Sequence, residues 1–332
     1  MEDKLDFNRR SVLAALAALG GAAASPQLMA QSAAAWPDKP IKIIVPVAAG
    51  GIIDLLARAV GKAITPIVKQ PVVIESRAGA DHMLGAQFVD RGEHDGYTWL
   101  FGSVPFTVAP VMRKDAGYDP RAFRPLALIA TSPNVLVVPS SLPVKNVAEF
   151  IALAKSKPGE LSYANPGNGS SNHLGMELFK SETGIDMLAV PYKGQPPAIA
   201  DLLAGRVQAM MMSSSLAGQH IKAGTLRPLA SVAPERLAIL PDVPTIKEAG
   251  YPNADVIPWF GLLAPAKTPE AVVSKAAALL SEALGTAGLK ADIANIGATP
   301  FPPGTPADFA KLIASDLAKW PNVLQRAGIE KS

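Results

Sequence analysis

The chain has 332 residues, 49% of them hydrophobic and 18% charged, with a formal net charge of +3 and no cysteine. This length and composition allow a large core, favour two lobes or domains, and exclude wholesale disorder. The absence of a Lys/Arg block speaks against nucleic acid as a partner, and the absence of cysteine excludes disulfides, thiolate metal sites and thiol nucleophiles.

Residues 1–35 have the pattern of an export signal. Arg9 and Arg10 precede a short apolar run, which small residues follow. The run is too short to span the ~30 Å hydrocarbon core of a bilayer. We therefore expect a cleaved signal, with cleavage after Ala30 or Ala35, and a mature protein in the periplasm. The arginine pair fits the twin-arginine route, and an ordinary Sec signal is an equal alternative.

From residue 36 onward, apolar runs of strand length alternate with segments of helical periodicity. Strands are expected at 41–47, 71–76, 97–103, 134–139, 160–165, 187–192, 207–213 and 226–232. Helices are expected at 54–64, 85–92, 147–156, 173–184, 198–206, 216–224, 269–288 and 306–320. This alternation predicts an α/β protein with mainly parallel sheets built from βαβ units.

Four loops in this pattern carry Gly, Pro or Ser between a strand and a helix. They are 47–54 (VAAGGIID), 76–85 (SRAGADHMLG), 101–110 (FGSVPFTVAP) and 165–173 (NPGNGSSNH). Ligands of open α/β sheets bind at the carboxyl ends of the strands, where such loops lie. Helix N-termini leave about four N–H groups without intrahelical partners, so converging helix starts predict an anion site made from backbone alone.

The serines of the fourth loop raise the alternative of a hydrolase. A nucleophile elbow reads G-x-S-x-G, because both glycines relieve crowding at a strained turn. Here Gly169 is followed by Ser170, Ser171, Asn172 and His173, so the last glycine is missing. A serine that caps the following helix is the favoured interpretation, with a capped helix that binds nothing as the plain structural one.

Other chemistries find less support in the sequence. The four histidines have neither metal-ligand spacing nor paired carboxylates. Gly61-Lys62 lacks the Ser/Thr and the first glycine of a P-loop. The run Met210 to Met212 is typical of a core strand, although one methionine could line a pocket. We expect no catalytic residue, no metal and no cofactor.

With these loops in place, the mature chain resembles the periplasmic substrate-binding receptors of tripartite tricarboxylate transporters, also called Bug receptors. The resemblance runs from WPDKPIKIIVPVAAGGIID through DGYTWLFGS, LSYANPGNGSSNHL, VPYKGQPPAIADLLAGRVQ, HIKAGTLRPLA and PDVPTIKEAG to WFGLLAPAKTP. It implies a two-lobed type II periplasmic-binding-protein fold, the Venus flytrap. Lobe one would be 36–136 with 236–332, and lobe two 137–235.

The resemblance also implies a receptor that captures a small carboxylate between its lobes, without catalysis. Its expected partners are the large and small membrane subunits of a transporter, and it is expected to be monomeric. A sensor that presents its ligand to a membrane signalling protein is the alternative. The residues expected to line the ligand cleft, with Asp54 bracing the first loop and its helix start, are Gly50, Gly51, Ile52, Ile53, Asp54, Ala80, Asp81, His82, Ser103, Val104, Asn165, Gly169, Ser170, Ser171, Tyr192, Lys193, Gly194 and Met212.

Several positions depart from the family pattern and bear on the ligand. Ile52, Ile53 and Met212 add apolar surface, which favours an aromatic or amphipathic acid over citrate. Asp81 would repel a second carboxylate and attract an amine or hydroxyl, and His82 could donate a hydrogen bond when protonated. An amino- or hydroxy-substituted aromatic monocarboxylate is therefore the first expectation, with a dicarboxylate second.

Overall fold

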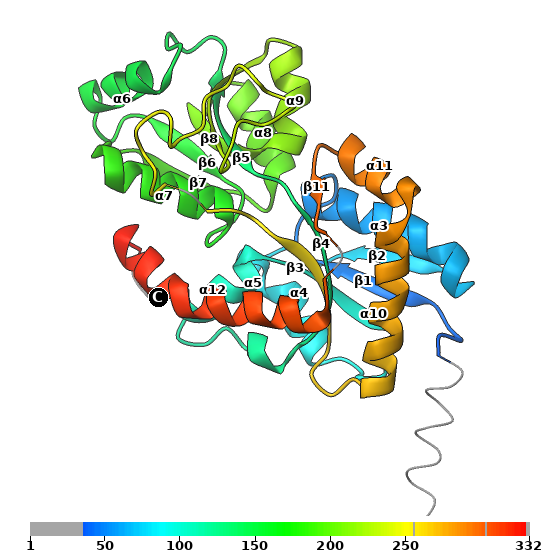
Figure 1. Ribbon diagram of the computed structural model, residues 1–332. Coiled ribbons are helices and arrows are strands. Elements are labelled where there is room, and N and C mark those ends of the chain that lie inside the picture. Colours follow the sequence, from blue (N-terminus) through cyan, green and yellow to red (C-terminus); the bar gives the residue numbers. More distant parts are fainter. Residues whose placement is uncertain (1–35, 255, 303, 330–332) are drawn as a thin grey trace, which may run out of the picture.

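The computed structural model describes residues 36–254, 256–302 and 304–329. The predicted export signal lies outside the described residues. The described chain forms two α/β lobes, each a sheet flanked by helices (Figure 1). We call the part built on the six-stranded sheet lobe one and the part built on the five-stranded sheet lobe two.

Lobe one has the strand order β11-β4-β10-β3-β1-β2. Helices α4, α5 and α12 pack on one face of this sheet, and α3, α10 and α11 on the other. The bounds are β1 (Ile41–Val45), α3 (Ile52–Val68), β2 (Val72–Ser76), η1 (Ala80–His82), α4 (Met83–Asp90), β3 (Thr98–Ser103), α5 (Val104–Met112), η2 (Pro120–Ala122), β4 (Arg124–Thr131), β10 (Phe260–Ala264), α10 (Glu270–Gly285), α11 (Ala287–Asn295), β11 (Thr299–Pro300) and α12 (Pro306–Arg326).

Lobe two has the strand order β7-β6-β8-β5-β9. Its elements are β5 (Asn134–Pro139), α6 (Val147–Ser156), β6 (Ser162–Asn165), α7 (Ser171–Thr183), β7 (Leu188–Pro191), α8 (Gln195–Leu203), β8 (Ala209–Ser213), α9 (Ser214–Lys222) and β9 (Leu226–Val232). Side chains alternate along β5: Leu136 and Val138 join the core that contains α6 and α7, whereas Val135 and Val137 join the core of α8 and α9. Helices thus cover both faces of this sheet, which explains its continuous apolar strands.

The α/β arrangement expected from the sequence is confirmed, with one difference in strand direction. β1 pairs in parallel with β2 and β3, and β6 with β7 and β8. The strands next to the passages between lobes run antiparallel instead: β10 to β3 and β4, and β5 to β8 and β9. The sequence did not predict β4 and β10, and α5 forms within a segment that was expected to be a loop. The helix expected at 269–288 ends near residue 285, where α10 and α11 meet at an angle of 74°.

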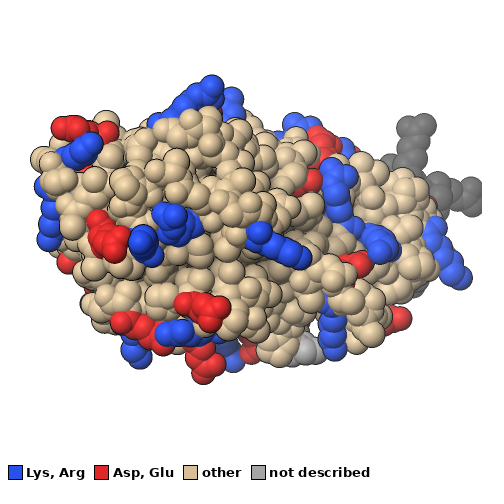
Figure 2. All heavy atoms as spheres, turned by 90° about the horizontal axis from the view of Figure 1, so that it is seen from above, with Lys and Arg blue, Asp and Glu red and all other residues tan. Residues whose placement is uncertain are grey.

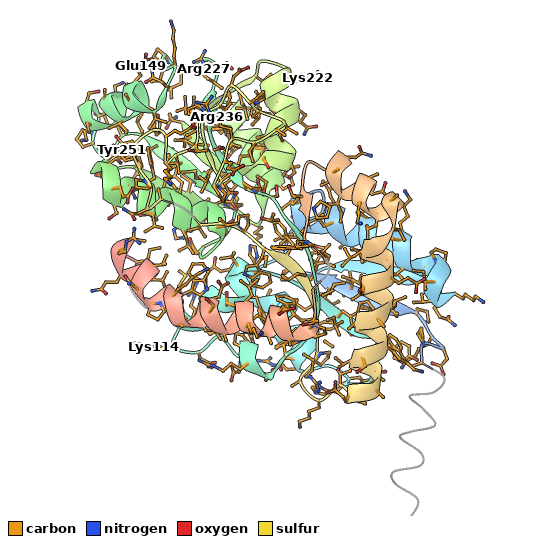
Figure 3. All side chains as sticks on the ribbon, viewed as in Figure 1. Lys114, Glu149, Lys222, Arg227, Arg236 and Tyr251 are labelled. Atoms are coloured by element: carbon orange, nitrogen blue, oxygen red, sulfur yellow. The ribbon has the colours of Figure 1, made fainter. Side chains whose placement is uncertain are left out.

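The sheets indicate where the chain passes between lobes. β4 ends at Thr131 in the first sheet and β5 begins at Asn134 in the second, so the passage precedes the expected boundary near 136. The segment after β9 stays with lobe two, because Thr245 bridges to Ser231 and Tyr251 packs edge-on against Phe179. Figure 3 shows Tyr251 on this lobe. We therefore propose lobe boundaries at 132–133 and 257–259 in place of 136 and 236.

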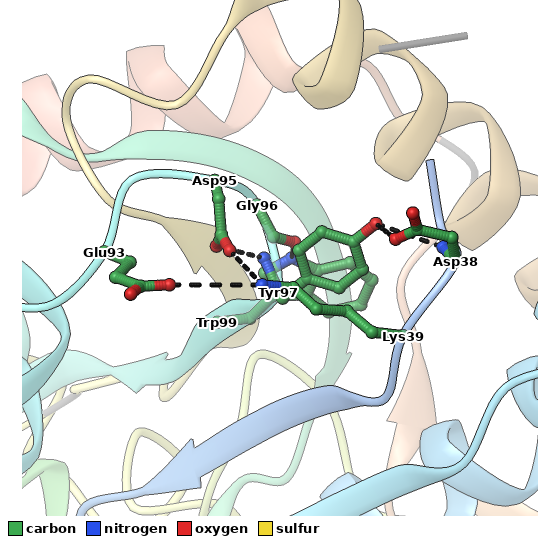
Figure 4. Close-up of polar contacts among 7 residues, drawn as sticks. All are labelled: Asp38, Lys39, Glu93, Asp95, Gly96, Tyr97 and Trp99. Atoms are coloured by element: carbon green, nitrogen blue, oxygen red, sulfur yellow. Dashed lines mark hydrogen bonds and ion pairs between the residues drawn. The ribbon is translucent and has the colours of Figure 1, made fainter. Parts of the chain in front are cut away.

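A polar cluster fixes the chain just before β1 to the far end of lobe one (Figure 4). Lys39 Nζ lies 2.7 Å from Asp95 Oδ2, and the Tyr97 hydroxyl donates to Asp38 at 2.5 Å. Trp99 Nε1 donates to the Gly96 carbonyl at 2.8 Å. Because Asp95 and Asp38 both find their donors within the cluster, these contacts hold the chain before β1 against the turn before β3.

The remaining surface offers no dominant charged patch on the face shown in Figure 2, where acidic and basic side chains are interspersed. Within the described residues, no single helix is long and apolar enough to cross a bilayer. The bent pair α10 and α11 meets that test only when its two helices are taken together.

Candidate functional site

A cavity lies between the two lobes, at the carboxyl ends of their strands. Its volume is about 40 Å³, which is enough for more than one water molecule at roughly 10–15 Å³ each. The described residues that line it are Val47, Gly51, Ile52, Ile53, His82, Ser103, Val104, Pro105, Pro166, Ser170, Ser171, Asn172, Gly194, Gln195, Ser213, Pro258 and Phe260.

Five helices begin at this cavity, two from lobe one and three from lobe two. The N-cap residues of α3, α5, α7, α8 and α9 all line it: Gly51, Ser103, Ser170, Gly194 and Ser213. This convergence follows from the fold, because each helix comes directly after a strand or short loop that ends at the same edge.

Most of these helix starts have no side-chain cap. Only Ser170 accepts a hydrogen bond from the first turn of its helix, from His173 N–H at 3.2 Å. The first N–H groups of α3, α5 and α8 therefore lack both an intrahelical acceptor and a capping side chain, whereas Ser214 N–H at the start of α9 donates to the Pro133 carbonyl at 2.9 Å. Proline removes a donor at Pro105 in α5 and at both Pro196 and Pro197 in α8.

The cavity carries no charged side chain among the described residues that line it. Its positive potential comes from helix ends, each equivalent to roughly half an elementary charge at its N-terminus. Val47, Ile52, Ile53 and Phe260 supply apolar walls. The arrangement can hold an anionic group by backbone N–H groups and enclose an apolar body beside it.

The first loop is braced from below by a buried carboxylate. Asp54 is 3% exposed, and its Oδ2 accepts from Gly50 N–H at 2.9 Å and from Arg58 Nε at 3.0 Å. Asp54 and Gly50 do not line the cavity; they hold Gly51 and Ile52 at its wall.

Lobe two presents a preorganised polar wall. Gln195 and Ser213 exchange two hydrogen bonds, Nε2 to Oγ at 2.8 Å and Ser213 N–H to Oε1 at 3.0 Å. Asn172 donates to Asn134 Oδ1 at 2.9 Å and to the Met211 carbonyl at 2.6 Å. Because these partners fix the side chains, the wall keeps its shape when the cavity is filled.

The serines of the fourth loop are tied to structural partners. Ser170 caps α7, and Ser171 Oγ accepts from Asn134 Nδ2 at 3.2 Å. His173 Nδ1 accepts from Gly169 N–H at 3.2 Å, and burial lowers the pKa of His173. No His–Ser hydrogen bond of a catalytic pair occurs in the described part of the chain.

A second, outer cavity of about 250 Å³ adjoins the first. His82 and Pro166 line both. Asp81 lines the outer cavity and is ion-paired with Arg113, which directly follows α5, and its Oδ1 accepts from Asn168 N–H of lobe two at 3.2 Å. Its other described lining residues are Pro46, Gly79, Ala80, Gly167, Pro191, Tyr192 and Lys193.

The predicted site residues separate into three groups. Gly51, Ile52, Ile53, His82, Ser103, Val104, Ser170, Ser171 and Gly194 line the inner cavity, and Ala80, Asp81, Tyr192 and Lys193 line the outer one. Gly50, Asp54, Asn165 and Gly169 lie behind the walls; Asn165, for example, accepts from Gly167 N–H at 2.9 Å and so shapes the lobe-two loop.

The prediction that Met212 lines the ligand cavity is wrong. It is 0% exposed and packs in the core of α8 and α9, so the expected apolar wall at this position does not exist. Side chains alternate along β8, and the residue that reaches the cavity is the next one, Ser213.

Sequence reasoning missed eight lining residues: Val47, Pro105, Pro166, Asn172, Gln195, Ser213, Pro258 and Phe260. Gln195 and Ser213 carry the same signal as the loops that were found, a strand end followed by a helix start. Pro258 and Phe260 carry no such signal, because they arrive from the segment that returns to lobe one. No group of three or more His, Asp or Glu side chains suited to a metal occurs among the described residues.

Comparisons with known proteins agree with this geometry. Residues 56–329 match the family described as tripartite tricarboxylate transporter family receptor. A UPF0065 protein from the tcbD–tcbE intergenic region of Pseudomonas sp. strain P51 is 34% identical over 324 residues, which cover 97% of this chain and 95% of that protein.

Solved structures extend the likeness to the fold. The periplasmic binding protein BugD has a TM-score of 0.86 and 31% identity, over 90% of this chain and 100% of its own. The R. palustris protein Rpa4515, solved with adipate, has a TM-score of 0.85 and 35% identity, over 89% and 99%. MatC from Rhodopseudomonas palustris, with bound malate, has a TM-score of 0.83 and 30% identity, over 87% and 100%. These structures confirm the two-lobed fold expected from the sequence.

Proposed function

The chain belongs to the receptor family of tripartite tricarboxylate transporters, and we propose that it captures a small carboxylate in the inner cavity between its lobes. The observation that carries this proposal is the convergence of five helix N-termini, four without a side-chain cap, on a cavity with no charged side chain among its described lining residues. Unpaired N–H groups at helix starts favour a negative group.

The structure changes the expected order of ligands. Asp81 faces the outer cavity and is neutralised by Arg113, so it no longer argues against a second carboxylate. Helix starts from both lobes face the cavity, and Ile52, Ile53 and Phe260 lie between polar groups. A short dicarboxylate with an apolar middle therefore fits at least as well as a substituted aromatic monocarboxylate. Adipate and malate, the ligands of two similar structures, are both dicarboxylates; adipate has an apolar middle, whereas malate carries a hydroxyl.

Binding without turnover is part of the proposal. Ser170 and Ser171 serve as helix cap and hydrogen-bond acceptor, and the ring of His173 faces a backbone N–H. The rival hydrolase predicts ester or amide cleavage that Ser170→Ala or Ser171→Ala abolishes. The sensor alternative shares the same site, and loss of uptake after gene deletion would separate transport from sensing.

The setting of the receptor is proposed from its relatives. BugD is a periplasmic binding protein, and the family works with tripartite transporters. We place this chain in the periplasm as a monomer that delivers its ligand to large and small membrane subunits. The export route and cleavage site lie in residues outside the structure.

The direct test removes one N–H from the site without deleting a side-chain donor. Ile52 is the first residue of α3, a position that accepts proline, and the preceding Gly51 is already extended (φ −79°, ψ 169°), as a residue before proline prefers. Ile52→Pro should weaken carboxylate binding about 10- to 100-fold, as expected for a lost hydrogen bond to a charged group. Ile52→Val keeps the N–H and is the control.

The assay is a thermal-shift screen of mono- and dicarboxylic acids, followed by calorimetry of those that bind. A ligand raises the melting temperature as RT ln(1 + [L]/Kd). Equal affinities of Ile52→Pro and Ile52→Val would refute a site made from backbone N–H groups. Small-angle scattering should also show a smaller radius of gyration with ligand, if the lobes close on it.

A further inference from the structure

His82 lies where three cavities meet. It lines the inner cavity, the outer cavity and a small third one beside Phe106. Both ring nitrogens, Nδ1 and Nε2, are buried and make no hydrogen bond of ordinary geometry, although the Pro166 carbonyl lies close enough to raise the pKa of the ring. Buried polar atoms are normally paired, so at least one ring nitrogen is left for a partner in the cavities that this side chain lines.

An unusual turn holds this imidazole in place. Ala80, Asp81 and His82 all have left-handed backbone angles, with φ of 45°, 51° and 73°. Such angles cost about 1–2 kcal/mol for each non-glycine residue and persist only where surrounding contacts enforce them. Here the enforcing contacts are the Asp81–Arg113 ion pair and the hydrogen bond from Asn168 N–H across the lobes.

The protonation state decides what the ring can recognise. Burial lowers the pKa of His82 to about 4, although Asp81 and the Pro166 carbonyl act in the opposite direction. At neutral pH the ring is uncharged and offers one N–H donor and one lone-pair acceptor. An ionised carboxylate can accept from the N–H, but it cannot donate to the lone pair.

We propose that His82 is a specificity-determining residue that selects carboxylates carrying a hydroxyl group, which donates to its free ring nitrogen. This inference rests on the proposed function. A hydroxyl is favoured over an ammonium group, because the helix N-termini around the inner cavity repel a positive charge and no described Asp or Glu lines it.

Two pairs of acids that differ by one hydroxyl test the proposal: malate against succinate, and mandelate against phenylacetate. The pairs cover the dicarboxylate and the aromatic ligand classes. By calorimetry, the wild-type protein should bind the hydroxy acid of at least one pair about 5- to 100-fold more tightly, since satisfying a buried acceptor is worth this much.

Two variants assign the preference to the ring. His82→Leu has no polar atom and should bring the ratio within the pair close to one, chiefly by weakening the hydroxy acid. His82→Asn keeps a donor and an acceptor and tolerates left-handed angles, so it should retain part of the preference.

Each outcome is decisive. A wild-type protein that binds both members of each pair equally overturns the inference, and so does a preference that survives in His82→Leu. If His82→Leu does not unfold cooperatively, His82→Asn decides: a ratio reduced from the wild-type value supports the ring, and an unchanged wild-type ratio counts against it. If no carboxylic acid binds the wild-type protein, the proposed function fails first and the inference falls with it.

Discussion

Gly167 of lobe two sits where only a glycine fits beside lobe one. Its φ is +146°, and a Cβ added there would lie 2.7 Å from His82 Nε2 and 3.1 Å from His82 Cδ2. The contact exists only when the lobes are together, because the two residues belong to different lobes. Gly167→Ala should therefore oppose closure more than it opposes folding.

The magnitude follows from the two effects. Backbone strain at this φ destabilises the variant by about 1–2 kcal/mol in any state. The overlap with the imidazole adds about 1–3 kcal/mol to the closed state alone, in the range found for overpacked sites. Since binding depends on closure, ligand affinity should fall about 5- to 150-fold.

Calorimetry and urea unfolding together separate these effects. Gly184→Ala is the control: this glycine ends α7 with φ +68° and has no atom within 4 Å of an added Cβ. It should lower stability by about 1 kcal/mol and leave affinity unchanged. Adding His82→Ala to Gly167→Ala removes the overlap and should restore much of the lost affinity for succinate, an acid without a hydroxyl. Wild-type affinity in Gly167→Ala, or an equal loss in Gly184→Ala, would refute the reasoning.

Three further predictions concern stability. In the folded protein the pKa of His82 is lowered from 6.5 to about 4, so at acidic pH the unfolded chain binds a proton at this ring more readily than the folded chain. This contribution to the free energy of unfolding is fully present above pH 6.5, and it should fall by about 3 kcal/mol as the pH drops to 4. Urea unfolding across this range should show a shallower decline in His82→Asn, and parallel curves would contradict the assignment. Asp316 is 0% exposed, accepts a hydrogen bond from Trp259 Nε1 at 2.7 Å and forms an ion pair with Lys319 at 2.5 Å. Asp316→Ala leaves buried donors unpaired and should lower the free energy of unfolding by about 3 kcal/mol. A decrease below about 1 kcal/mol in urea unfolding would contradict this. Ser170→Ala removes the N-cap of α7 and should reduce the free energy of unfolding by about 1 kcal/mol, seen as a lower melting temperature. If the protein cleaved an ester or amide and Ser170→Ala abolished that turnover, the hydrolase would be supported instead.

Much of the fold was predictable because its signals are local. Apolar periodicity of two or 3.6 residues identified the strands and helices of both lobes, and short Gly/Ser stretches marked most of the helix starts. The loop 47–54 reached the cavity for this reason, since Gly51 and Ile52 stand directly at the start of α3. The sequence analysis did not predict β4 and β10, because these strands lie next to the passages between the sheets and belong to no βαβ unit.

The sequence by itself determined the order of strands and helices and the family resemblance, and so the kind of site at the ends of the strands. Only the tertiary structure decided which side chains reach that site. The side chain of Met212 lies in a core, whereas that of Ser213 lines the cavity. Asp81 forms an ion pair with Arg113, and Phe260 lines the cavity from a segment distant in the sequence. The physical reason is that periodicity specifies which face of an element is buried, whereas pairing across lobes depends on how separate elements pack. The ring of His82 meets the lobe-two loop only because Gly167 leaves room for it, a contact between residues far apart in the sequence.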